Sequence, residues 1–190
     1  NNSAYNKFLI KNNALSINQV IDFAGTAYLR DYEYEKALNW FSKASGKTAE
    51  PDISTDPFIE LLYDQEESIA NEKADYTKVS FTKEMLRLQN LAASDKSKAS
   101  GSFYKMALGM YNMTYYGHAW KLVQYYRSGS DGYSIPDGAT DFEKEYYGCF
   151  TAEAYFKKAM EASSDKNFKA KCLFMMAKCA QKQIKRPQYS

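Results

Sequence analysis

The chain has 190 residues, of which 45% are hydrophobic and 25% are charged. Such a length and composition suit one folded domain of ordinary size, and they exclude wholesale disorder and collagen-like or linker-like sequence. A formal net charge of +2 is too small to indicate nucleic-acid binding, and the sequence holds no apolar run of about 18 residues that could span a membrane.

The expected elements are helices almost throughout, because apolar residues recur at steps of three and four and hardly any segment alternates like a strand. In chain order, the expected helices cover residues 17–31, 33–44, 57–71, 76–93, 98–115, 117–128, 146–162 and 167–184. Ser16 is an N-cap candidate for the first helix, and Asp56 followed by Pro57 is a start signal for the third. No element is assigned to 1–13, and 128–141 is the clearest loop. The fold class expected is therefore all-α.

Small residues stand among large ones in the first two expected helices. Missing side-chain bulk at Gly25 and Ala37 would let the helices approach closely, while the rings of Tyr28 and Phe41 fill the remaining space. This spacing resembles that of the tetratricopeptide repeat (TPR), although an Ile stands where that pattern has Trp. The resemblance implies a pair of antiparallel helices over this part of the chain.

Weaker copies of the same pattern are anchored at Ala107 and Ala177. The three anchors are 82 and 70 residues apart, far from a strict period of about 34 residues. We therefore expect a single TPR-like domain over residues 1–190, an αα-superhelix of antiparallel helix pairs with degenerate repeats; an irregular helical bundle is the alternative. Because the chain begins at Asn1 without a Met, we expect it to be a piece of a longer protein.

A longer resemblance runs from Asp56 to Cys179. Four segments in that order, DPFIELLYD, YTKVSFTKEMLRLQ, YNMTYYGHAW and KAKCLFMMAKC, are similar to stretches of large repeat-containing proteins of Bacteroidetes. The resemblance implies no catalytic residues. It implies a bacterial cell-envelope location, periplasmic or at the surface, which no sequence signal supports independently.

The first helix of each pair supplies the candidate binding residues, since in a TPR superhelix these helices line a concave groove. Mapped from the three anchors, the groove-facing residues are Asp22, Thr26, Leu29, Arg30, Tyr104, Leu108, Tyr111, Asn112, Lys171, Phe174, Lys178 and Lys182. Lys and aromatic groups suit an acidic peptide or a carboxylate. We therefore expect a non-enzymatic scaffold for protein–protein interaction. The alternative is that Tyr104 and Tyr111 pack against the next helix pair.

A second functional hypothesis is a glycan-binding module. The stretch SFYKMALGMYNMTYYGHAW resembles the helical part of SusD-like glycan-capture proteins, and it implies aromatic platforms for sugars. The platform candidates are Tyr115, Tyr116, Trp120, Tyr125 and Tyr126. At least two exposed and roughly coplanar rings would favour sugar binding, whereas buried rings would favour the scaffold.

Charge is unevenly distributed along the chain. Residues 50–75 hold nine acidic residues and one Lys, whereas 157–186 hold nine basic and two acidic residues. Such runs could form two faces of one stack or a contact between neighbouring copies. We interpret the acidic and the basic run as two solvated faces of the protein.

Catalytic motifs are scarce. The sequence has no zinc-protease, nucleophile-elbow or phosphate-loop motif, so neither a metal nor a cofactor is expected. The single histidine, His118, follows a glycine at an expected helix start and suggests a surface or capping group. Catalysis by Cys149 would require His118 close by. We expect all three cysteines (Cys149, Cys172 and Cys179) to be small buried hydrophobic residues.

Overall fold

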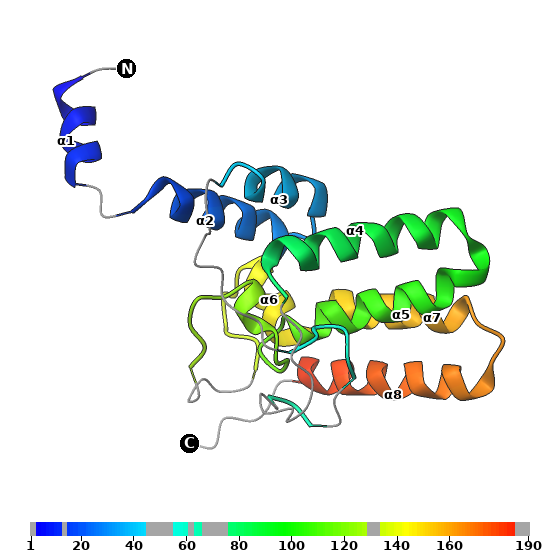
Figure 1. Ribbon diagram of the computed structural model, residues 1–190. Helices are drawn as coiled ribbons and strands as arrows, with labels where there is room; N and C mark the ends of the chain where they lie inside the picture. Colours follow the sequence, from blue (N-terminus) through cyan, green and yellow to red (C-terminus); the bar gives the residue numbers. More distant parts are fainter. Residues whose placement is uncertain are drawn as a thin grey trace, which may run out of the picture.

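The computed structural model describes residues 3–12, 15–44, 55–60, 63–65, 76–128 and 134–184. Within these ranges it is all-helical and contains no strand, which confirms the expected fold class (Figure 1). The helices are α1 (Ala4–Asn12), α2 (Ile17–Arg30), α3 (Tyr34–Phe41), α4 (Lys78–Ser94), α5 (Lys96–Asn112), the 3₁₀ turn η1 (Trp120–Leu122), α6 (Asp141–Gly148), α7 (Phe150–Glu161) and α8 (Lys166–Gln183).

Local sequence explains where these helices begin. Ser16 caps α2 as predicted: its hydroxyl accepts from the Gln19 N–H, and the Gln19 side chain accepts from the Ser16 N–H. Thr77 caps α4 with the same kind of reciprocal pair. Asp95 alone joins α4 to α5, because it ends the first helix and its carboxylate accepts from the second residue of the next.

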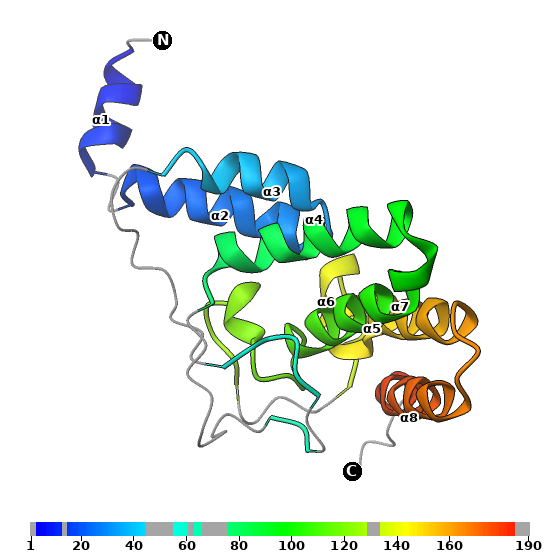
Figure 2. The same ribbon diagram turned by 45° about the vertical axis from the view of Figure 1, so that its right-hand side comes forward.

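Successive helices pack as neighbours. The pairs α2/α3, α4/α5 and α7/α8 are in contact, and α3 meets α4 while α5 meets α7 (Figures 1 and 2). Only α1 lies away from the other helices in both views, with Tyr5 and Phe8 exposed on it. The central helix is α5, which is flanked by α4 and α7 and is buried along most of its second half.

The contact between α2 and α3 follows the predicted packing of small and large residues. A Cβ added at Gly25 would lie 2.3 Å from Cε1 of Phe41, so the ring occupies the space of the missing side chain. Ala37 is completely buried. Gly25, Ala37 and Phe41 therefore make the close contact expected from the sequence.

The prediction of a helix over 117–128 is wrong. Only η1 forms there, because the chain turns back on the end of α5: the Ala119 N–H donates to Asn112 O at 2.8 Å. Gly117 permits this turn, since a Cβ on it would lie 2.2 Å from Asn112 Cα.

Two further helix predictions need correction. Over 57–71, the described residues form turns: the Asp56 carboxylate accepts from the Phe58 N–H at 2.9 Å without starting a helix, and the remaining residues lie outside the described ranges. The helix expected over 146–162 is divided into α6 and α7 by Cys149, whose φ of 55° is left-handed.

Candidate functional site

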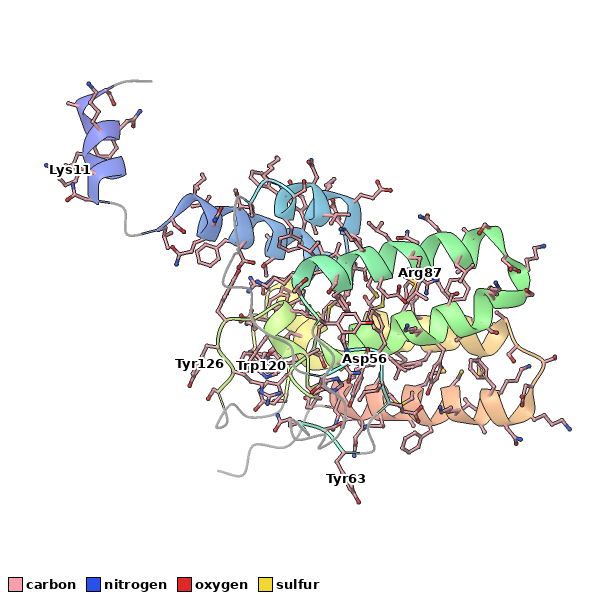
Figure 3. All side chains as sticks on the ribbon, in the orientation of Figure 1. Lys11, Asp56, Tyr63, Arg87, Trp120 and Tyr126 are labelled. Carbon is pink, nitrogen blue, oxygen red and sulfur yellow. The ribbon has the colours of Figure 1, made fainter. Side chains whose placement is uncertain are left out.

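The described residues 55–60 and 63–65, which we call the strap, contact both α5 and α8. Figure 3 shows Asp56 close to these two helices and Tyr63 pointing away from them. Tyr63 is 70% exposed, whereas Phe58 is only 5% exposed. The strap therefore has one side against the helices and another toward solvent.

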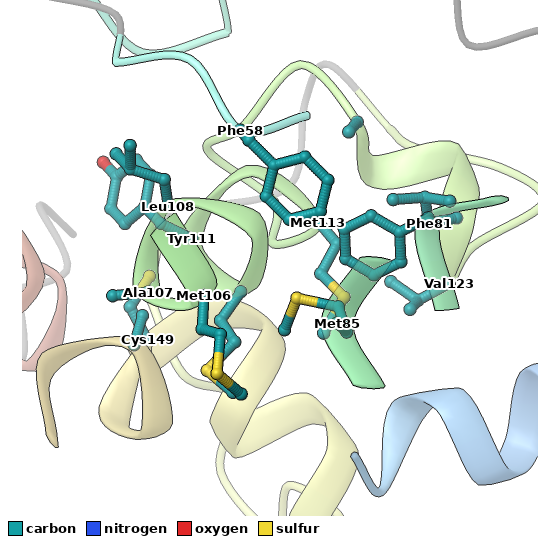
Figure 4. Close-up of a cluster of buried hydrophobic side chains, with 14 of the residues drawn as sticks. Phe58, Phe81, Met85, Met106, Ala107, Leu108, Tyr111, Met113, Val123 and Cys149 are labelled. Atoms are coloured by element: carbon teal, nitrogen blue, oxygen red, sulfur yellow. The ribbon is translucent and has the colours of Figure 1, made fainter. Parts of the chain in front are cut away.

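Phe58 anchors the strap in an aromatic pocket. Its ring stacks on Phe81 with centroids 5.2 Å apart (Figure 4). The pocket exists because α5 has a glycine here: a Cβ on Gly109 would lie 2.9 Å from Cε1 of Phe58. The Lys105 ammonium lies 4.9 Å from the Phe58 ring centroid and covers it. Phe58 is thus packed as a core residue.

Side chains from α5 and the turn after it bind the strap backbone. The Asn112 amide donates to Pro57 O at 2.9 Å and to Ile59 O at 2.8 Å. His118 Nε2 donates to Asp56 O at 2.9 Å. Both binding side chains are buried, which corrects the expectation that His118 is a surface or capping group. The backbone carbonyl groups of Asp56, Pro57 and Ile59 therefore bind the strap to α5 and to the turn after it.

The first of two carboxylate contacts involves Glu60. Tyr104 Oη donates to Glu60 Oε2 at 2.6 Å, and Lys171 Nζ lies 2.7 Å from the same oxygen. The Lys171 ammonium is also 5.3 Å from the Tyr104 ring centroid. We call Tyr104 and Lys171 the first clamp. With Lys171 51% exposed, this clamp is partly screened by water.

The second contact involves Asp64 and is more buried. Tyr111 Oη donates to Asp64 Oδ1 at 2.6 Å, Lys178 Nζ lies 3.1 Å from that oxygen, and Lys182 pairs with Oδ2. The Lys178 ammonium is 5.3 Å from the Tyr111 ring centroid. We call Tyr111, Lys178 and Lys182 the second clamp. Its lysine side chains are only 13% and 9% exposed, so their charges require a partner.

The two clamps repeat at the same spacing on both helices. Tyr104 and Tyr111 are seven residues apart on α5, and Lys171 and Lys178 are seven apart on α8. Seven residues are two helical turns, or about 10.5 Å. Since the lower-numbered pair contacts Glu60 and the higher-numbered pair contacts Asp64, the two helices run in the same direction.

These contacts change how the two charge runs are interpreted. Glu60 and Asp64 belong to the acidic run, and the lysines of both clamps belong to the basic run. The acidic and basic runs therefore pair with each other within one chain. The prediction of two solvated faces is wrong for these residues.

Protonation states fit carboxylate recognition. Burial alone would raise the pKa of Asp64, but hydrogen bonds from Lys182 and Tyr111 and the charges of Lys178 and Lys182 outweigh it, so its pKa lies below the usual 3.8. Burial and the hydrogen bond to Glu60 raise the pKa of Tyr104 well above its usual value. Burial is also the main reason why the pKa of Tyr111 is raised. Both phenols therefore stay protonated and donate hydrogen bonds to the carboxylates.

Six of the residues predicted to face the groove meet at the strap; they are Tyr104, Tyr111, Asn112, Lys171, Lys178 and Lys182. Sequence reasoning missed Phe58, Glu60 and Asp64, which face them. The acidic run and the seven-residue spacing of Tyr and Lys were the signals that could have indicated this pairing.

Asp22 and Thr26 belong to a second polar cluster, at the N-terminus of α4. Lys78 is 1% exposed there, and its ammonium lies 2.9 Å from both Asp22 oxygens and 2.8 Å from Thr26 Oγ1. Tyr125 Oη donates to Asp22 Oδ2 at 2.5 Å. This cluster joins α2 to α4, and no pattern in the sequence indicated that Lys78 would be buried.

Arg30 has a third environment. Its guanidinium donates to Val123 O at 2.8 Å and to Gln124 Oε1 at 3.1 Å, and it lies 4.3 Å from the Phe142 ring centroid. The contacts of Arg30 thus tie the end of α2 to the segment after η1 and to α6, rather than to the strap.

The five candidate sugar platforms fall into two groups. Tyr115 and Tyr116 are buried, at 1% and 4% exposure, and Trp120 is half-buried. Tyr125 and Tyr126 are exposed, at 51% and 76%. The plane of the Tyr125 ring lies at 84° to that of the neighbouring Phe23 ring, so Tyr125 and Phe23 do not form one flat surface.

The cysteines are all buried, as predicted. Cys149 Sγ lies 3.6 Å from Thr114 Oγ1. A hydrogen bond with Cys149 and burial raise the pKa of the Cys179 thiol, which therefore stays protonated at neutral pH. Among the described residues, no group of three or more His, Cys, Asp or Glu side chains is arranged to hold a metal ion.

Comparison with models of known protein families, with characterised protein sequences and with solved structures finds no match to this chain. The helices in the described ranges are all too short or too polar to cross a bilayer. What the chain does must therefore be inferred from its own residues.

Proposed function

We propose that this chain is a non-enzymatic interaction scaffold whose α5–α8 face binds an acidic segment of a protein partner. The observation that supports this most is the strap itself: the face already holds an acidic segment of the same chain, in a turned conformation, through backbone carbonyls and two carboxylates. The groups that hold it are hydrogen-bond donors and cations, as peptide recognition requires.

The finer architecture we propose is a TPR-like αα-superhelix with degenerate repeats. Three helix pairs in succession, α2/α3, α4/α5 and α7/α8, support it, as does the close packing of Gly25 on Phe41. In such an array, helices of the same direction lie side by side and form a continuous surface. The parallel α5 and α8, which carry the two clamps, are the second helices of the pairs α4/α5 and α7/α8, not the first helices that were expected to line the binding groove.

The experiment is a binding measurement with a fluorescent peptide that copies residues 55–65. The chain is used as a Glu60→Gln/Asp64→Asn variant, in which the strap has lost both carboxylates. We expect fluorescence anisotropy to report binding that is lost when Lys178→Gln and Lys182→Gln are added. Lys157→Gln/Lys166→Gln, which removes two exposed charges of the same sign, is the matched control and should leave binding unchanged. Equal loss with both pairs would contradict the proposal.

A second candidate function, glycan binding, is supported only by the exposure of Tyr125 and Tyr126. Sugar platforms need open aromatic faces. The Lys78 ammonium lies 4.5 Å from the Tyr125 ring centroid, so Tyr126, which is 76% exposed, is the stronger candidate. A glycan array on the wild-type chain and on Tyr126→Ala tests this candidate: binding that disappears in the variant would favour it over the peptide scaffold.

A further inference from the structure

We propose that the partner of the α5–α8 face repeats the chemical pattern of the strap and binds by displacing it. The pattern is an aromatic residue, a carboxylate two residues later and a second carboxylate four residues after that, as in Phe58, Glu60 and Asp64. This inference rests on the function proposed above, and it names both the partner's chemistry and its competitor.

The spacing of the carboxylates follows from the spacing of the clamps. The two clamps are two helical turns apart, or about 10.5 Å. Four residues of nearly extended chain reach about 13 Å, which is enough to place one carboxylate in each clamp. Two residues reach only about 7 Å and leave one clamp empty. An empty second clamp would leave the buried ammonium groups of Lys178 and Lys182 without their carboxylate.

The aromatic residue follows from the pocket next to Gly109. If Phe58 leaves, the space against Phe81 and Gly109 opens to water or stays empty, and either outcome is unfavourable. A partner with an aromatic side chain at the same position refills the pocket. Exchange of one segment for the other then keeps the apolar contact, the backbone hydrogen bonds and both ion pairs.

The strap and a partner cannot occupy the site together. The carbonyl groups of Pro57 and Ile59 already take both donors of the Asn112 amide, and Asp64 already takes the second clamp. The strap is also part of the same chain, so it competes for the site as an intramolecular ligand, whose effective concentration does not fall when the protein is diluted. A free segment therefore binds only in proportion to the fraction of molecules in which the strap is released.

The test compares the wild-type chain with Glu60→Gln/Asp64→Asn, using the labelled peptide of residues 55–65. Hydrogen exchange over the strap first measures its release in each protein. We expect faster strap exchange in the variant and peptide binding at least about tenfold tighter than to wild type. A peptide of the same composition in scrambled order, and one shortened by two residues between its carboxylates, should each bind at least about tenfold more weakly.

Each other result overturns a distinct part of the proposal. Equal binding to both proteins would mean that the strap does not compete, and equal binding of the scrambled peptide would mean that no pattern is recognised; either result overturns this inference but leaves the proposed function. Unchanged strap exchange in the variant would also overturn it. Faster strap exchange with no peptide binding would overturn the proposed function itself. A concentration-dependent dimer of the wild-type chain that is lost in the variant would overturn a separate partner, because a second copy of this chain would then be the occupant.

Discussion

Between α2 and α3 the contact depends on shape, whereas the strap combines a shape-dependent contact of Phe58 with charged contacts to α5 and α8. Phe41 fills the volume that Gly25 leaves open, and no polar group takes part in that close approach. Asp64, by contrast, is held by a phenol and two ammonium groups. The Phe41 ring fills a space inside one helix pair, so no second segment can take its place. In our proposal, carboxylates of a second segment replace those of the strap. We propose that the charged contacts of the strap, rather than the packing of α2 on α3, are suited to reversible binding.

The largest expected effect is that of Gly117→Ala, which disrupts the turn after α5. His118 of this turn donates a hydrogen bond to the strap. The added Cβ would lie 2.2 Å from Asn112 Cα and from its carbonyl oxygen, and backbone atoms cannot move aside cheaply. We expect a loss of more than about 3 kcal/mol in unfolding free energy. Urea denaturation followed by circular dichroism measures it. Gly101→Ala, where an added Cβ meets nothing within 4 Å, is the control and should not destabilise the protein.

Lys78→Ala should have the next largest effect. It leaves the Asp22 carboxylate and Thr26 without the buried ammonium that joins them, and we expect a cost of about 3 kcal/mol in unfolding free energy. Lys36→Ala removes an exposed pair with Glu33 that water screens, and it should leave the unfolding free energy unchanged. Similar costs for both lysines would refute the assignment of Lys78 as a structural ion pair.

Gly25→Ala tests the shape-dependent region. The added methyl group collides with the Phe41 ring, and we expect a loss of about 2 kcal/mol. Because the obstacle is one side chain, the double variant Gly25→Ala/Phe41→Leu should recover part of that loss. Thermal melting of both variants checks this, and peptide binding at the strap site should not change. No recovery in the double variant would mean that Phe41 is not the residue that limits the space.

Acid should release the strap before it disturbs α2 and α3. The pKa of Asp64 is lowered in the folded protein, so its stabilising contribution is complete above about pH 4 and is lost as the pH falls through the lower folded value. We expect the protection of the strap amides, measured relative to the intrinsic exchange rate at each pH, to fall below about pH 4 in the wild type. In Asp64→Asn the strap should already exchange fast at neutral pH and show a weaker dependence on acid.

The smallest expected effect distinguishes the two clamps. Glu60→Gln affects the first clamp, in which Lys171 is half exposed, and we expect it to cost less than about 1 kcal/mol. Asp64→Asn leaves two nearly buried ammonium groups with a neutral partner and should cost about 2 kcal/mol. Denaturation of the two single variants measures the difference, and a larger cost for Glu60→Gln would reverse our ranking of the clamps.

Local features of the fold could be predicted from sequence. The capping box of Ser16 and the packing of Gly25 against Phe41 involve residues close in sequence, and their spacing carries the information. Tyr111 and Lys178 were also predicted to lie at a site that suits acidic peptides, because their residue types and helix positions indicate it. All of these inferences depend on short-range periodicity.

The occupant of that site could not be predicted, because it comes from a distant part of the chain. Asp64 and Lys182 are 118 residues apart, and no local pattern specifies such a pairing. The helix start signal at Asp56 and Pro57 was misleading for the same reason. Capture of the Pro57 and Ile59 carbonyls by Asn112 takes the acceptors that a helix would have used.

The most direct measurement of the central claim is hydrogen exchange of the strap in the wild type and in Lys178→Gln/Lys182→Gln. The Gln65 N–H, which donates to Tyr116 O at 2.7 Å, is a suitable reporter. The account predicts that its exchange accelerates at least about tenfold in the variant while amides of α2 and α3 keep their wild-type rates. Unchanged strap exchange, or equal acceleration throughout the molecule, would contradict a site that holds the strap by its charges.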